Sequence, residues 1–353
     1  MASDLILWFR DIQKAHIHQV GRKAVSLAEL ARIGIRVPSG FALTLKAHER
    51  TMHETGLGER IRCYLEKFEK ANLLSLRNSQ STGNHILKMM KGTRLPEDIR
   101  SELFEAYERL CEVTGIHNVP VSVRSSGPIS HPGLFDTYLN VQGKAQLEQK
   151  VVASWASVFA PRAIADRALR GCPVEEYYIG VIIVQMVNAR SAGVLFTVNP
   201  ITGDLNEAVI EGSWGLGESV VQAKVTPDQF TVDKKSLELK ERIVNEKLTE
   251  VIMTYQGTVV RPVSRERQAV ACLTEDEVRE LVRLAKIAEI YYGGIPQDME
   301  WSIAADYPFP DNVFFLQTRP VVGVQWDTKY ADKPAGKSST DHIADLMVER
   351  LIG

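Results

Sequence analysis

Apolar residues recur at helical spacing in three segments of the chain. Between Lys23 and Ile33 they occupy positions 24, 27, 30 and 31, with Gly34 next, which predicts a short amphipathic helix that ends at a glycine. A second helix is predicted from Pro96, and a third from the capping box Thr274-Glu275-Asp276-Glu277. The apolar faces of these two helices carry Ile99, Leu103, Ala106, Tyr107 and Leu110 in one, and Val278, Leu281, Val282, Ala285 and Ala288 in the other.

Strand-like segments begin after Asn118. They cover residues 119–123, 134–141, 181–184 and 193–198, with helical patterns at 147–159 and 162–169 between them, and a hairpin of 297–303 with 313–319 near the end. The pattern predicts a mixed α/β chain of the α+β class with two lobes. We expect one lobe at 1–197, a second at 198–322, and a linker with a tail helix at 323–353.

The hairpin carries the most informative chemistry. Side chains alternate along a strand, so Asp298 and Glu300 share one face and Met299 shares the other with Trp301. On the second strand the same alternation groups Phe315, Gln317 and Arg319. If the polar faces coincide, two carboxylates, an amide and a guanidinium meet, as a Mg²⁺-nucleoside triphosphate site requires. The alternative is a solvated sheet face with a surface ion pair.

Four further positions are candidates for nucleotide contacts. Arg124 ends a buried strand; Lys23 follows Gly21 and Arg22 at a helix start, where terminal N–H groups can face an anion. Glu211 opens the glycine-rich run 211–218, and Gln185 ends a strand that can line an adenine edge. For each there is a structural alternative: a turn, a solvated lysine, a packing turn and a core strand. His131 is interpreted as a loop histidine.

Composition restricts the partners. The net charge is −2 and the pI is near 6.5, so nucleic acid and anionic membrane are not expected as partners. The cysteines have no spacing typical of a zinc site, and 18 apolar residues never run together. We therefore expect a cytoplasmic protein.

In their order along the chain, several motifs resemble the N-terminal ATP-binding domain of the phosphoenolpyruvate synthase and pyruvate phosphate dikinase family. The resemblance covers about residues 8 to 322. The motifs are Gly21-Arg22-Lys23, Val37-Pro38-Ser39-Gly40-Phe41, Val123-Arg124-Ser125-Ser126, Pro132-Gly133-Leu134-Phe135-Asp136-Thr137, Gly193-Val194-Leu195-Phe196-Thr197, Trp214-Gly215-Leu216-Gly217-Glu218, Asp298-Met299-Glu300-Trp301 and Leu316-Gln317-Thr318-Arg319-Pro320.

The resemblance implies a two-lobed ATP-grasp-like fold and a role for each candidate. Lys23, Arg124 and Arg319 would hold the triphosphate and act in catalysis, and Asp298 and Glu300 would bind Mg²⁺ or Mn²⁺. The remaining cofactor-binding candidates are Arg162, Gln185, Glu211 and Gln317. Arg22 stands where family members commonly have a second glycine, which affects the details of the phosphate-covering loop.

Family enzymes also contain a phosphohistidine domain, and no Thr-Ser-His-Ala-like segment occurs in this sequence. The resemblance therefore implies that ATP phosphorylates a histidine on a separate subunit, as in the similar beta subunit of phenylphosphate synthase, where phenol becomes phenylphosphate with AMP and phosphate as products. The alternatives are part of another phosphoenolpyruvate-synthase-like or antibiotic-phosphorylating enzyme, a carboxylate–amine ligase, and a non-catalytic nucleotide sensor.

Overall fold

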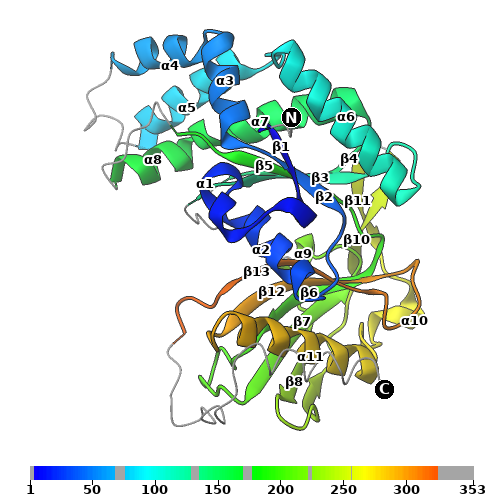
Figure 1. The fold of residues 1–353 in the computed structure, drawn as a ribbon. Helices are drawn as coiled ribbons and strands as arrows, with labels where there is room; N and C mark the ends of the chain where they lie inside the picture. The colour runs from blue at the N-terminus through cyan, green and yellow to red at the C-terminus, as the bar shows by residue number, and fades with distance from the viewer. Residues whose placement is uncertain are drawn as a thin grey trace. The chain divides into compact units, whose positions relative to one another are not determined.

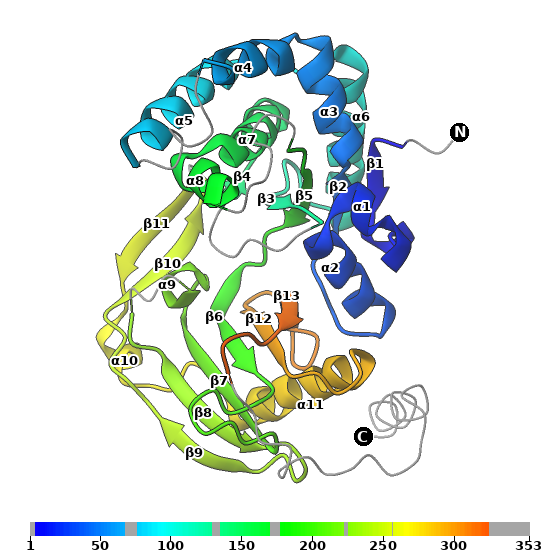
Figure 2. The ribbon, with the colours of Figure 1, turned by 90° about the vertical axis from the view of Figure 1, so that its left-hand side faces the viewer.

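The chain divides into two compact units. The computed structural model describes residues 4–67, 76–128, 135–169, 177–221, 225–255 and 257–324 (Figures 1 and 2). The first unit contains 1–28 and 39–186, and the second contains 29–38 and 187–353. The first unit therefore ends at residue 186, the segment 29–38 belongs to the second unit, and the lobe boundary at 197 stays a prediction. The predicted tail helix and His131 lie outside the described residues.

The first unit is built on an antiparallel sheet in the order β1-β2-β5-β3-β4. Its strands are β1 (Ile6–Trp8), β2 (Gly40–Leu43), β5 (Gly180–Gln185), β3 (Val121–Ser126) and β4 (Thr137–Val141). The central strand β5 is buried along almost its whole length, as expected for a strand covered on both faces. The middle of the chain is thus strand-rich, as the sequence predicts.

Helices supply most of the core of this unit. They are α1 (Ile17–Val20), α2 (Arg22–Arg32), α3 (Leu45–Glu54), α4 (Leu57–Leu65), α5 (Leu76–Met90), α6 (Glu97–Thr114), α7 (Lys144–Ala156) and α8 (Pro161–Leu169), with 3₁₀ helices η1 (Phe9–Asp11), η2 (Lys14–His16) and η4 (Ser157–Phe159). The exception is α2, which begins in the first unit but whose last turn, with Leu30, belongs to the core of the second. The apolar positions predicted for α6 are the ones that are buried. The sequence-based helices at 23–33 and from 96 are therefore confirmed.

The second unit is built on a larger antiparallel sheet in the order β13-β12-β6-β7-β8-β9. Its strands are β6 (Ala189–Phe196), β7 (Glu207–Trp214), β8 (Asp228–Asp233), β9 (Leu239–Ile243), β12 (Gln297–Ala304) and β13 (Val313–Pro320). A separate hairpin joins β10 (Thr249–Thr254) to β11 (Gly257–Pro262). The short helices are α9 (Glu218–Val221) and α10 (Arg265–Gln268). The hairpin predicted near the end of the chain is confirmed as β12 and β13.

One long helix, α11 (Glu275–Tyr291), covers one face of the larger sheet (Figures 1 and 2). Its predicted capping box is present, because Glu277 N donates to Thr274 Oγ1 over 3.3 Å and Thr274 N donates to Glu277 Oε2 over 2.9 Å. The predicted apolar positions of α11 are buried against the sheet. This leaves the other face of the sheet to carry the polar side chains of β12 and β13.

Trp301 fixes the helix-covered face of the sheet. It lies in one row with Gly193 and Gly212, and a Cβ on Gly212 would come within 2.6 Å of the indole. The indole Nε1 donates to Val194 O over 3.0 Å. Gly212 therefore leaves the space that the ring occupies, and the fully buried Trp301 holds β12 against its neighbours.

No helix of the described ranges has the length and apolar character needed to cross a membrane.

Candidate functional site

The polar face of the β12–β13 hairpin brings four predicted residues together. Asp298 lies opposite Arg319, and Glu300 lies opposite Gln317. Arg319 donates from Nε and Nη2 to Asp298 Oδ2 over 2.7 Å and 2.6 Å. The predicted coincidence of the two polar faces is therefore confirmed.

A β-bulge makes this alignment possible. The register shifts between Glu300 and Trp301, so Trp301 faces Phe315 and Leu316 is the extra residue on β13. Phe315 is fully buried in the core with Trp301. The prediction that Phe315 shares a face with Gln317 and Arg319 is wrong, because the extra residue reverses the alternation between them.

The same row continues across the sheet to a third carboxylate. Val194 on β6 lies between Glu300 and Glu211, which is on β7. Neighbouring strands are about 4.8 Å apart, so the backbones of Glu211 and Glu300 are separated by roughly two strand spacings. Within the described residues no hydrogen bond or ion pair is formed by the Glu211 carboxylate, and burial raises its pKa.

Electrostatics favour a cation on this face. Burial raises the pKa of Asp298, with a further increase from Glu300 and a partly offsetting decrease from Arg319. The described residues contain no group of three or more His, Cys, Asp or Glu side chains able to hold a metal. Asp298, Glu300 and the Gln317 amide are hard oxygen donors that suit Mg²⁺, an ion that usually takes one or two carboxylates together with substrate phosphates. The residues present therefore fit such an ion.

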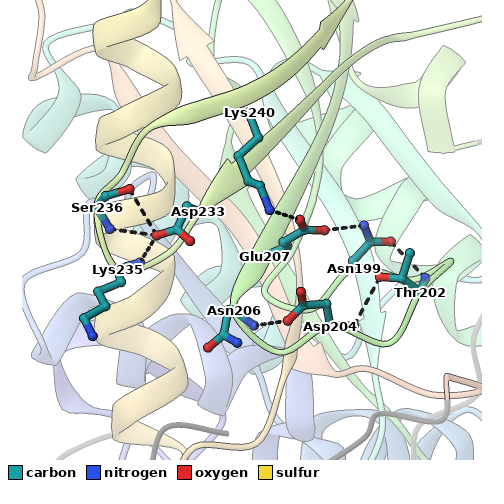
Figure 3. Close-up of polar contacts among 9 residues, drawn as sticks. All are labelled: Asn199, Thr202, Asp204, Asn206, Glu207, Asp233, Lys235, Ser236 and Lys240. Carbon is teal, nitrogen blue, oxygen red and sulfur yellow. Dashed lines mark hydrogen bonds and ion pairs between the residues drawn. The ribbon is translucent and has the colours of Figure 1, made fainter. Parts of the chain in front are cut away.

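The turns next to this face form a second acidic cluster, and its contacts show that it is structural (Figure 3). Asn199 Oδ1 accepts from the N–H groups of Ile201 and Thr202 over 3.0 Å and 3.2 Å. Burial alone would raise the pKa of Glu207, but hydrogen bonds from Lys240 and Asn199 outweigh it and lower the pKa. The carboxylates drawn in Figure 3 already accept hydrogen bonds within and beside the turns. The cluster is therefore not a metal-site candidate.

In the first unit, the start of α2 is fixed to the end of β3. Gly21 has a φ of +80°, and a Cβ there would lie 2.3 Å from Ser126 O, so only glycine fits without displacing the strand. Arg22 N donates to Gly127 O over 2.9 Å, and Ala24 N donates to Ser126 Oγ over 3.3 Å. Through these contacts Lys23 lies beside the end of β3, which comes two residues after Arg124.

These bonds correct one detail of the prediction for Lys23. Two of the N–H groups at the helix start already donate to Ser126 of β3 and to Gly127 just after it, so these two do not face an anion as expected. The Arg22 Nε also donates to Pro128 O over 2.8 Å. Arg22 thus has a role in holding the start of the following loop, which sequence reasoning missed because it treated this arginine only as a departure from the family pattern.

Arg162 and Gln185 occupy different places in the first unit. Arg162, on α8, forms an exposed ion pair of 2.6 Å with Asp136, which precedes Thr137, the cross-strand neighbour of Arg124. Sequence reasoning did not foresee Asp136 as its partner. Gln185 ends β5 opposite Val121, and its N–H donates to Ser39 O over 2.8 Å. Arg162 therefore approaches the β3–β4 edge, whereas Gln185 lies at the opposite end of β3.

The fold, the carboxylate–guanidinium face and the fixed helix start are features of an α+β nucleotide-binding domain. The family model described as "Pyruvate phosphate dikinase, AMP/ATP-binding domain" matches residues 17–339. The chain therefore belongs to the phosphoenolpyruvate synthase and pyruvate phosphate dikinase family and corresponds to its ATP-binding domain.

Relatives with curated names agree with this assignment. The chain is 34% identical over 361 residues to "Probable phosphoenolpyruvate synthase" of Staphylothermus marinus, covering 94% of this chain and 43% of the relative. It is also 34% identical over 360 residues to "Phosphoenolpyruvate synthase" of Aeropyrum pernix, covering 91% and 42% of the two chains. The chain thus spans less than half the length of these relatives.

Proposed function

We propose that this chain binds Mg²⁺- or Mn²⁺-ATP and passes a phosphoryl or pyrophosphoryl group to a histidine on a separate subunit. The observation that carries the proposal is the alignment of Asp298 with Arg319 and of Glu300 with Gln317. It combines metal-binding oxygens with a fixed guanidinium, and phosphoryl transfer depends mainly on such positioning and charge neutralisation.

Each candidate residue has a specific task in this proposal. Asp298 and Glu300 hold the divalent ion with help from Gln317, and the ion neutralises phosphate charge when bound. Arg319 is oriented by its two bonds to Asp298 and binds phosphate oxygens. Lys23, Arg124 and Arg162 bind the phosphates from the first unit, with Gln185 beside the adenine and Glu211 at the nucleotide. The site of action is the cytoplasm.

The final acceptor has three candidates. Similarity to the phenylphosphate synthase beta subunit favours phenol, which would yield phenylphosphate, AMP and phosphate. The names of the relatives favour phosphoenolpyruvate formation, and the name of the matching family favours pyruvate as the acceptor. An antibiotic acceptor belongs to the same type of reaction. A regulatory nucleotide sensor is less favoured, because the complete carboxylate, amide and guanidinium set is retained on one face.

The test uses the full chain with the histidine-bearing protein that co-purifies with it. With γ- or β-labelled ATP, we expect acid-labile label on the partner, AMP as a product, and loss of both with Glu300→Ala. The control is Glu241→Ala, an exposed glutamate on β9. Nucleotide binding without labelling of any partner would favour the sensor, and ADP without phosphohistidine would favour the ligase. Adding phenol or pyruvate then distinguishes the acceptors.

A further inference from the structure

The second unit contains a cavity of about 490 Å³ that lies away from the carboxylate–guanidinium face of β12 and β13. Its lining includes Arg190, Trp214, Glu250, Met253, Arg261 and Arg267, which we call the arginine pocket. Ala305, just after β12, also lines it, and it is separated from Asp298 by about 23 Å along an extended strand. The pocket is therefore distinct from the carboxylate–guanidinium face.

Two arginines share one buried carboxylate in this pocket. The Glu250 side chain is only 4% exposed and accepts from Arg261 Nε over 2.9 Å. Arg267 donates to both Glu250 oxygens over 3.3 Å. Within the described ranges the terminal nitrogens of Arg261 donate to no protein acceptor. One carboxylate thus offsets two guanidinium groups, and a positive charge is left over.

The charge of the third arginine, Arg190, is offset by the carboxylate of Glu277. Arg190 Nη2 donates to Glu277 Oε2 over 2.6 Å, whereas its Nε is buried with no hydrogen-bond partner in the described parts of the chain. Asp306, which follows the lining residue Ala305, is exposed and accepts from Asn188 Nδ2 over 2.8 Å. The terminal guanidinium nitrogens of Arg261, together with the guanidinium of Arg190 that also lines the cavity, suit an oxyanion.

The rest of the lining combines an aromatic ring and aliphatic side chains with the amide of Asn188. The Arg267 guanidinium lies 4.3 Å from the centroid of the Trp214 ring, and Trp214 Nε1 donates to Arg267 O over 2.9 Å. Ile252 and Met253 add aliphatic surface. Small-molecule sites have this composition, with an apolar lining and a few fixed polar groups, and volumes of about 300–1,000 Å³.

We propose that the arginine pocket binds a small organic anion whose carboxylate or phosphate group contacts Arg261 and Arg190 and whose apolar or aromatic body lies against Trp214 and Met253. The ligand is neither the nucleotide nor its metal, so the pocket is a second binding site in the unit. It offers a place where a metabolite regulates the protein independently of the ATP site.

Calorimetric titrations of the full chain with benzoate, inorganic phosphate and benzyl alcohol test this proposal. We expect saturable binding of at least one anion and none of the neutral alcohol. Arg261→Gln should weaken binding at least tenfold, and Met253→Trp should abolish it by filling the cavity with no change in charge. Arg265→Gln, an exposed arginine on the neighbouring α10, is the matched control and should bind as the wild type does.

The relative affinities identify the ligand chemistry. Tighter benzoate binding assigns a carboxylate, and tighter phosphate binding assigns a phosphate compound; both support the pocket. The proposal is overturned if neither anion binds saturably, or if binding survives both Arg261→Gln and Met253→Trp. Loss of binding with Arg319→Gln but not with Arg261→Gln also overturns the proposal, because the anion would then occupy the carboxylate–guanidinium face. Circular dichroism of each variant confirms that it is folded.

Discussion

Glu300 on β12 lies directly opposite Gln317 on β13, although the next residue, Trp301, lies opposite Phe315. The extra residue Leu316 accounts for this change of register. It allows one strand to place Phe315 in the core and Gln317 and Arg319 on the opposite face. The candidate metal site therefore depends on the number of residues in β13 as well as on their identity.

Deleting Leu316 should destroy the site. Without the extra residue, Gln317 and Arg319 would turn toward the α11 face, where burial of polar groups without partners costs about 3 kcal/mol or more. We expect a lower free energy of unfolding and no measurable Mg²⁺-ATP binding. Leu316→Ala, which keeps the residue count, should retain binding. Denaturant titration and calorimetry compare the two, and nucleotide binding by the deletion variant would contradict the role of the bulge.

Gly21→Ala should weaken the junction between α2 and β3. The new Cβ would meet Ser126 O at 2.3 Å at a φ of +80°, so strain and overlap together should cost about 3 kcal/mol. Gly56→Ala is the matched control, since Gly56 has a φ of +69° with no atom within 4 Å of a new Cβ. It should cost only about 1 kcal/mol.

We expect nucleotide affinity to fall with Gly21→Ala and to stay unchanged with Gly56→Ala. Equal losses of stability in the two variants would show that backbone conformation, and not the contact with β3, makes glycine necessary at position 21.

His48 should make the first unit less stable in acid. Burial lowers its pKa to about 3, and its ring stacks on Trp155 while Nδ1 accepts from Ile179 N over 3.1 Å. The unfolded chain binds the proton with a pKa near 6.5. Keeping His48 neutral in the folded state therefore costs nothing above pH 6.5. As the pH falls from 6.5 toward 3, the unfolded chain gains the proton first, and the free energy of unfolding decreases by about 2 kcal/mol at pH 5.

Denaturant unfolding from pH 7.5 to 4.5 measures this effect. His48→Gln should flatten the pH dependence, and the exposed His53→Gln should leave it unchanged. An unaltered slope in the His48 variant would mean that other groups cause the acid sensitivity.

The buried ion pair of Lys247 and Asp228 should be a strong structural constraint in the second unit. Both side chains are fully buried, and Asp228 also accepts from the N–H groups of Asn245 and Cys272 over 2.9 Å and 2.8 Å. Lys247→Met leaves a buried carboxylate without its cation, which costs about 3 to 5 kcal/mol.

Adding Asp228→Asn to Lys247→Met removes the buried charge and should restore part of the lost free energy of unfolding. Denaturant unfolding of the single and double variants provides the measurement; a double variant no more stable than Lys247→Met would argue against charge burial as the cause.

The sequence predicted those features that depend on local periodicity and capping. The α11 capping box and the hairpin from Gln297 follow from such patterns. The bulge at Leu316 could not be predicted, because strict alternation is the default for a strand and the extra residue is selected by packing of Phe315 in the core. The contact of Gly21 with Ser126 joins residues far apart in the chain, and no local pattern specifies it.

The row formed by Trp301, Gly193 and Gly212 restricts which sequences can carry this site. A side chain on Gly212 would collide with the indole, and one on Gly193 would lie 1.9 Å from Glu211 O. Glu211 and Glu300 are chain neighbours of this row, so the spacing of the acidic side chains depends on residues that never touch a ligand. A substitution at one position of this row is therefore expected to require a compensating substitution at another. Replacing one glycine alone should impair function, although no polar group is removed.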